Sequence, residues 1–123
     1  MGEMPPKRIT CFGDDARLNR RQQIEQVRQG GKSYPGRYAV VVVLKTPPDG
    51  MRRAAFLISR RFDLLSVRRN RARRLFRESL RLLFPRMLPC WMLMIPRRLI
   101  KGAKCGEVSR ELESLLLRAG VLR

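Results

Sequence analysis

The chain has 123 residues, and 28 lysines and arginines against 10 acidic residues give it a formal net charge of +18. A hydrophobic content of 44% supplies enough material for a packed core, which argues against a disordered basic tail. We find no run of about 18 apolar residues and therefore expect no membrane span. Three scattered cysteines predict neither a disulfide framework nor a zinc site, and the first residues lack the apolar core of a signal peptide, so we expect a cytoplasmic protein.

The first third of the chain predicts a tail, a helix and a strand. Proline and glycine interrupt the first residues without any hydrophobic period, so we expect a flexible tail over 1–15 and a single domain over 16–123. A helix with a thin apolar stripe is predicted over 16–29, and the Gly-Gly pair that follows is expected to end it. The β-branched run over 37–44 is the strongest strand signal in the chain.

We expect a central helix over 66–84 to organise the domain. Ser66 is a suitable N-cap, and at about 100° per residue the helix separates into an apolar stripe and a basic side. The stripe consists of Ala72, Leu75, Phe76, Ser79 and Leu83, with Leu80 and Leu82 at its margins. The basic side consists of Arg69, Asn70, Arg71, Arg73, Arg74, Arg77 and Arg81. One face is therefore predicted to pack on the sheet and the other to meet an anion.

The other predicted elements surround this helix. A second strand is expected over 54–60, after a PPDG turn, and a third over 90–95. A basic loop follows, and a helix over 107–119 with a clear apolar stripe closes at Gly120. The order helix, strand, strand, helix, strand, helix predicts an α+β fold, a small α/β sandwich. Its sheet should have about four strands, one of them short or poorly marked.

The basic side of the central helix favours phosphate binding over simple solvation. Arginines four residues apart repel one another by a few tenths of a kcal/mol, and Glu78 is the only acidic residue within the helix. Guanidinium groups, unlike lysine ammonium groups, match phosphate in a bidentate manner. A self-repelling row made of arginine alone is therefore typical of a surface that faces nucleic acid.

Catalytic chemistry is poorly represented in the sequence. There is no histidine, the acidic residues are dispersed, and neither a P-loop nor a dinucleotide fingerprint is present. We therefore expect a binding protein, and a non-enzymatic ribosomal-type or DNA-binding basic α/β protein stays open as an alternative. A membrane-surface or calmodulin-target helix is disfavoured, because the core needs the apolar stripe.

The central helix contains Arg69-Asn70-Arg71, continued by Arg73-Arg74 and Arg77-Glu78, and Ser59-Arg60-Arg61 precedes the helix. This pattern closely resembles the extended RNR motif of the bacterial ribonuclease P protein component. The resemblance covers about residues 16–119, with the strands and the C-terminal helix in the family's order. It implies that the RNR helix forms a left-handed βαβ crossover, an exception to the usual right-handed rule.

The resemblance also implies a function. Members of the family bind the ribonuclease P RNA, and the holoenzyme cleaves precursor tRNA to make the mature 5′ end. The chemistry belongs to the RNA and its Mg²⁺ ions, so the protein is expected to be a non-catalytic subunit that binds no cofactor tightly and partners neither DNA nor membrane. The implied RNA-contacting residues are Arg60, Arg61, Arg68, Arg69, Asn70, Arg71, Arg73, Arg74 and Arg77. Asn70 is expected either to contact RNA or to brace the start of the helix.

A groove between the first helix and the sheet holds the single-stranded 5′ leader in this family. Ile24 stands where the family usually has an aromatic residue, and Val41 stands at another aromatic position. Tyr34 or Tyr38 could compensate, although Tyr38 is expected instead to anchor the sheet. The resemblance therefore implies a leader groove lined by Ile24, Tyr34 and Val41, with less base stacking than is usual. Asp63 stands near a frequent glycine of the family, which predicts a different loop before the central helix.

Overall fold

A computed structural model of the chain describes Leu18 and residues 20–122, so the expected tail over 1–15 lies outside the described residues. The helices in this part of the chain are α1 (Arg21–Gly30), α2 (Ser66–Leu83) and α3 (Cys105–Ala119). The strands are β1 (Lys32–Pro35), β2 (Ala39–Leu44), β3 (Arg53–Phe56) and β4 (Trp91–Pro96). Two short 3-10 helices, η3 (Phe84–Arg86) and η4 (Arg98–Gly102), follow α2 and β4.

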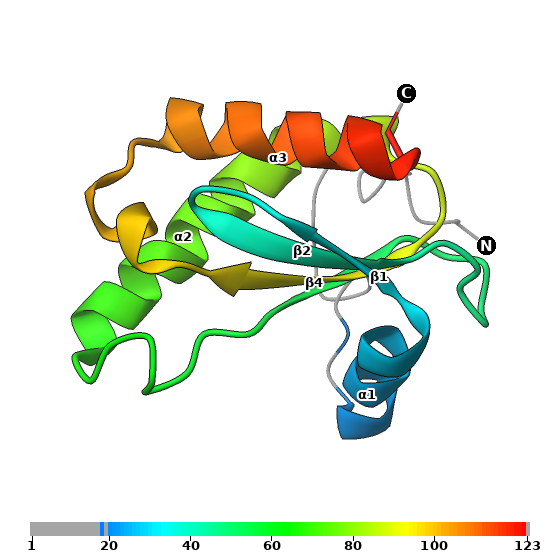
Figure 1. Cartoon of the computed structure of the whole chain (residues 1–123), viewed down its shortest axis with the longest axis horizontal. Coiled ribbons are helices and arrows are strands. Elements are labelled where there is room, and N and C mark those ends of the chain that lie inside the picture. Colours follow the sequence, from blue (N-terminus) through cyan, green and yellow to red (C-terminus); the bar gives the residue numbers. More distant parts are fainter. Residues whose placement is uncertain (1–17, 19, 123) are drawn as a thin grey trace, which may run out of the picture.

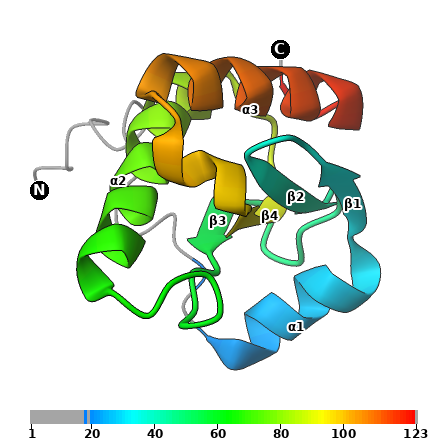
Figure 2. The same ribbon diagram turned by 60° about the vertical axis from the view of Figure 1, so that its left-hand side comes forward.

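The four strands form one mixed sheet in the order β1-β2-β4-β3. β2 pairs antiparallel with both β1 and β4, whereas β3 and β4 run parallel and are joined through α2. Figures 1 and 2 show α1 on one side of the sheet and α2 and α3 on the other. The α+β fold with a four-stranded sheet is thereby confirmed, and α2 is its crossover element; the hand of the crossover remains an expectation of the resemblance.

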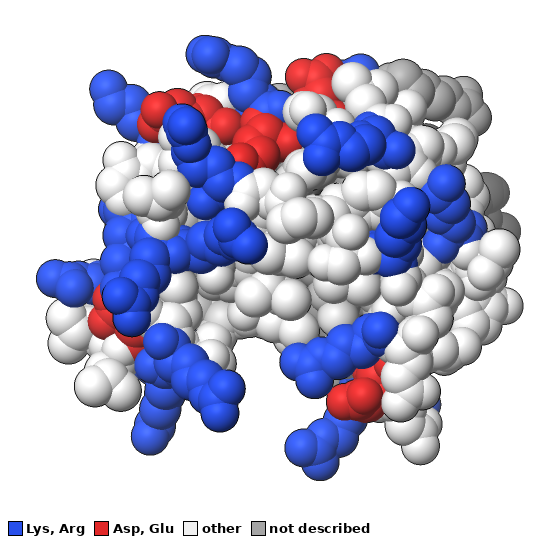
Figure 3. Space-filling view, viewed as in Figure 1, with Lys and Arg blue, Asp and Glu red and all other residues white. Residues whose placement is uncertain are grey.

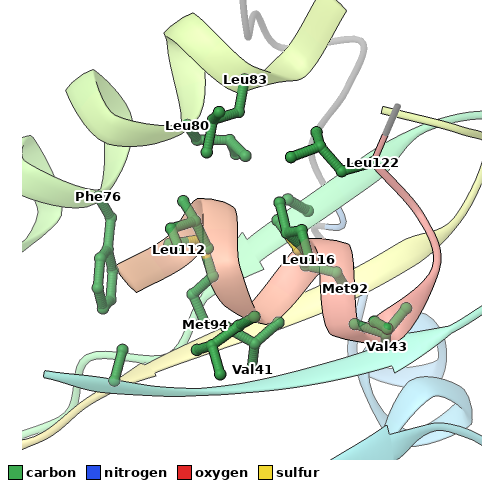
Figure 4. Packing of buried hydrophobic residues seen from close by; sticks show 14 of the residues in the cluster. Val41, Val43, Phe76, Leu80, Leu83, Met92, Met94, Leu112, Leu116 and Leu122 are labelled. Carbon is green, nitrogen blue, oxygen red and sulfur yellow. The ribbon is translucent and has the colours of Figure 1, made fainter. Parts of the chain in front are cut away.

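The larger part of the core lies between the sheet and the pair α2 and α3. Because side chains alternate between the two faces of a strand, every second residue of β2 and β4 points to these helices. Figure 4 shows residues of both helices meeting the sheet there. The buried side chains at this contact include Val41, Val43, Met92, Met94, Phe76, Leu80, Leu112 and Leu116. This packing fixes α2 against the sheet and sets which of its faces meets solvent.

The opposite face of the sheet carries a smaller cluster beneath α1. Val27 of α1 is buried there with Val42, Trp91 and Leu93 from the sheet. Gly31 follows α1 at a point of close approach, where a Cβ atom would lie 2.5 Å from the carbonyl oxygen of Val27. Glycine is therefore required where the chain passes from α1 into β1.

Several predicted boundaries differ from the structure. Within the described residues α1 begins at Arg21 instead of at residue 16, because the Leu18 amide donates to the carbonyl oxygen of Ala54 (3.0 Å) and Leu18 thus lies along β3. The short fourth strand, which the sequence predicts without placing it, is β1. Ser66 is the first residue of α2 and not its N-cap, which is Leu65.

Candidate nucleic-acid interface

The buried side of α2 agrees with the predicted stripe. Its buried residues are Ala72, Phe76, Ser79, Leu80 and Leu83, so Leu80 belongs to the stripe itself. Leu75, expected in the stripe, is only half-buried, and Leu82 is exposed. The outermost line of the helix includes Asn70, Arg74, Glu78 and Arg81, and Arg81 pairs there with Glu78 (3.0 Å).

The most accessible of the predicted RNA-contacting side chains are those of Arg60, Arg61, Arg68, Asn70, Arg71 and Arg74, all of which are exposed. The guanidinium groups of Arg60, Arg61 and Arg74 make no hydrogen bond or ion pair with another described residue, and Arg61 donates to Ser59 only through its backbone amide. Their charges are therefore available to an external anion. Figure 3 shows basic side chains gathered over the side of the molecule where α2 and the preceding loop lie.

Two arginines of the RNR motif brace the fold, which the sequence did not reveal. Arg69 donates to the carbonyl oxygens of Asp63 (3.0 Å) and Leu64 (2.9 Å) in the loop before α2. Arg71 donates to the carbonyl oxygens of Lys101 (2.9 Å) and Ala103 (3.0 Å) and so ties α2 to the end of η4. Carbonyl groups are neutral, so both guanidinium groups keep their full charge while they hold the backbone.

Arg73 and Arg77 are half-buried on the flank of α2. Arg73 donates to the Oδ1 atom of Asn70 (2.9 Å), a contact within α2 itself. The Nε atom of Arg77 is buried and has no hydrogen-bond partner among the described residues. The row Arg69, Arg73, Arg77 therefore lies beside the exposed centre of the helix and not along it.

Asp63 is an acidic residue in the loop before α2. Its carboxylate accepts from the Leu65 amide (3.0 Å) and pairs with Lys101 (3.0 Å) and more loosely with Arg68 (3.5 Å). The backbone hydrogen bond from Leu65, followed by the hydrogen bond and charge of Lys101, lowers the pKa of Asp63 to about 2. Asp63 is thus ionised at neutral pH and links the loop before α2 to η4.

A cleft of about 870 Å³ opens on the other side of this loop, toward α1. Its apolar lining includes Leu57, Ile58, Ile95 and Pro96, and its basic lining consists of Arg28, Arg61, Arg97 and Arg98. In Figure 3 the lower edge of the molecule is hollowed between two basic groups. An apolar floor with a cationic rim suits a single strand, whose bases need apolar contact and whose phosphates need positive charge.

The expected leader groove of Ile24, Tyr34 and Val41 is wrong as a set. Ile24 packs against the cluster beneath α1, but Tyr34 and Val41 are buried on the opposite face of the sheet, under α2 and α3. The reason is the strand register, since β1 and β2 pair Tyr34 with Val41 and both point to that face. Arg97 and Arg98 belong to the basic loop that the sequence predicts after the strand over 90–95, but only the fold brings them to one cleft with Arg28.

The described residues contain no group of three or more His, Cys, Asp or Glu side chains placed to hold a metal ion. Burial raises the pKa of the Cys90 thiol to about 12, so this cysteine is a core residue and not a nucleophile. No helix among the described residues is both long and apolar enough to cross a lipid bilayer.

A small basic α+β domain, with an arginine-rich crossover helix beside a basic cleft, is the class of protein that this geometry defines. The family model described as Ribonuclease P matches residues 12–120. The ribonuclease P protein component of Symbiobacterium thermophilum is 35% identical over 108 residues, which cover 87% of this chain and 93% of the relative. That of Chloroflexus aurantiacus is 39% identical over 108 residues, covering 86% and 78% of the two chains. The chain belongs to the ribonuclease P protein component family.

Solved structures agree with this fold. The ribonuclease P protein of Staphylococcus aureus superimposes with a TM-score of 0.77 at 21% identity, covering 88% of this chain and 98% of that one. The ribonuclease P protein of Thermotoga maritima gives a TM-score of 0.72 at 26% identity, covering 83% and 96%. The three helices and the mixed four-stranded sheet are thus the architecture of the family.

Proposed function

We propose that this chain is the protein subunit of a ribonuclease P ribonucleoprotein and binds the ribonuclease P RNA through the exposed face of α2. The observation that carries this proposal is the set of exposed cations on α2 and the loop before it, Arg60, Arg61 and Arg74, which have no acidic partner among the described residues. Such side chains bind phosphates and release counterions, which makes the affinity strongly salt-dependent. The holoenzyme would mature the 5′ ends of tRNAs in the cytoplasm.

Within this proposal the protein does not carry out the cleavage. Arginine side chains and backbone amides bind and orient an RNA, and the Mg²⁺ ions that supply the chemistry would be held by the RNA. The predicted contacts Arg68, Arg69, Arg71, Arg73 and Arg77 add positive charge at the flanks of α2. Of these, Arg69 and Arg71 also hold the neighbouring backbone in place.

The cleft beside α1 is proposed to hold the 5′ leader of precursor tRNA. Its floor at Leu57 and Ile95 offers apolar contact to bases, and Arg97 and Arg98 on its rim offer charge to phosphates. With Tyr34 and Val41 facing the other side of the sheet, Ile24 is the member of the expected set that stays on the side of the cleft. Leader binding should therefore depend on aliphatic packing more than on aromatic stacking.

Reconstitution tests the proposal. The full chain is combined with the ribonuclease P RNA of the same genome at low Mg²⁺, and cleavage of a precursor tRNA is followed. We expect the protein to restore cleavage, and Arg74→Ala to reduce RNA affinity, whereas Arg118→Ala removes the same charge from an exposed site on α3 and should have little effect. Absence of any stimulation would contradict the proposal.

The cleft is tested with two substrates that differ only in leader length. Ile95→Ala should reduce the advantage of a long leader over a one-nucleotide leader and leave affinity for the ribonuclease P RNA unchanged. An equal loss for both substrates would place the leader elsewhere. Sequencing the RNA that co-purifies with the chain separates this function from the ribosomal or DNA-binding alternative, because recovery of ribosomal RNA alone would contradict our assignment.

A further inference from the structure

Three aliphatic side chains stand exposed within four consecutive positions where the chain enters α2. Leu64 is 80% exposed, Leu65 is 54% exposed and Val67 is 76% exposed. Single exposed apolar residues are ordinary on protein surfaces, and Leu99 and Leu117 are examples on other elements. Three exposed aliphatic residues so close together in the chain are not ordinary, and exposed apolar groups of this kind are typical of contact surfaces. We call these three residues the apolar tip.

The apolar tip is held in place by hydrogen bonds from both sides. Arg69 donates to the carbonyl oxygens of Asp63 and Leu64, and the Asp63 carboxylate accepts from the Leu65 amide. Asp63 is in turn paired with Lys101 of η4 (3.0 Å). The loop is therefore fixed in a shape that presents its leucines to solvent, and a partner would not bear the entropic cost of ordering it.

The surroundings of the apolar tip indicate what covers it. The exposed cations Arg60, Arg61 and Arg68 lie next to it in the chain, and Asp63, the acidic residue of this loop, is already paired with Lys101 and Arg68. The complementary partner therefore combines an apolar surface with negative charge. An unstacked nucleotide has both, in its base face and its phosphate, and the tip is continuous with the exposed face of α2.

We propose that the apolar tip formed by Leu64, Leu65 and Val67 packs against an unstacked base of the RNA that α2 binds. This inference rests on the proposed function and adds a salt-independent contact to the electrostatic one. The base is selected by being unpaired and accessible and not by its hydrogen-bonding edge, since aliphatic side chains offer no donor or acceptor.

The test compares Leu64→Ser/Val67→Ser with Leu117→Ser, which replaces an exposed leucine on α3 (51%). Affinity of the full-length proteins for the ribonuclease P RNA of the same genome is measured as a function of salt, and thermal unfolding checks that all variants fold. We expect the tip variant to bind roughly tenfold more weakly with an unchanged salt slope, because burial of apolar side chains is lost while every phosphate contact stays. Chemical probing should show an unpaired base that is protected by the unaltered protein and not by the tip variant.

Unchanged affinity, or an equal loss in Leu117→Ser, would overturn the inference while leaving RNA binding intact. Failure of the unaltered protein to bind the RNA would instead contradict the proposed function. Sedimentation that shows self-association lost in the tip variant would assign the surface to a second copy of the chain. Cosedimentation with phosphatidylglycerol vesicles that is lost in the tip variant would assign it to a membrane. Either result overturns RNA contact.

Discussion

Replacing Arg71 with methionine should make the folded protein less stable, although Arg71 belongs to the motif that implies RNA contact. Arg71 donates to the carbonyl oxygens of Lys101 at 2.9 Å and Ala103 at 3.0 Å, with a weaker contact to Ile100 at 3.4 Å. Methionine keeps the aliphatic stem but removes these donors. Counting the two shorter bonds at about 0.5–1.5 kcal/mol each, we expect the free energy of unfolding to fall by about 1–3 kcal/mol.

Urea unfolding followed by circular dichroism measures this change, and Arg74→Met is the matched control. The Arg74 guanidinium group makes no such hydrogen bond with another described residue. The free energy of unfolding of Arg74→Met should therefore lie within about 0.5 kcal/mol of that of the unaltered protein. In RNA binding we expect Arg74→Met to make the dependence of log affinity on log salt shallower by roughly one unit. Arg71→Lys keeps the charge and should preserve that slope while still losing stability.

Equal urea midpoints for Arg71→Met and the unaltered protein would refute the bracing role. A stability loss of the same size in Arg74→Met would also refute it, because the effect would then follow from removing charge from α2 and not from the bonds to η4.

Three further predictions concern stability and reactivity. Phe76→Ala should lower the free energy of unfolding by about 3–5 kcal/mol in urea titrations, because Phe76 is fully buried and packs on Phe56 at 5.5 Å between ring centroids. Asp63 has a pKa of about 2 in the folded protein and an ordinary value of 3.8, so its contribution to stability is present above about pH 4 and is lost as the pH falls toward 2. Asp63→Asn should flatten this part of a plot of urea midpoint against pH, and an unchanged plot would contradict the ion pair. Cys90 should resist thiol reagents in the native state, whereas the half-buried Cys105 should react faster; equal rates by mass spectrometry would contradict the burial of Cys90.

The elements predicted well are those with strong local signals. The β-branched run became β2 and the two-sided helix became α2. Helix α3 ends at Ala119 and is capped by Gly120, whose φ of 79° favours glycine. β1 has no such signal, because it is a four-residue strand in which only Tyr34 is buried and it is defined by pairing with β2. The start of α1 was misplaced for a similar reason, since Leu18 is held by β3 and not by its neighbours in sequence.

The nucleic-acid interface also has one part that the sequence predicted and another part that it did not. The sequence alone determined that α2 has an apolar side and an arginine-rich side, because both follow from residue type and the helical period. It could not separate exposed Arg74 from bracing Arg71, since the carbonyl groups that Arg71 holds come from residues about thirty positions later.

Which residues line the cleft was decided only by the tertiary structure. Whether a residue of β2 faces α1 or α2 depends on strand pairing, and a shift of one position exchanges the two faces of a strand. That register removed Tyr34 and Val41 from the predicted groove, and the meeting of α1 with the ends of β3 and β4 put Arg28, Arg97 and Arg98 around it. Local sequence therefore determined the charged helix, and long-range pairing determined what lies beside it.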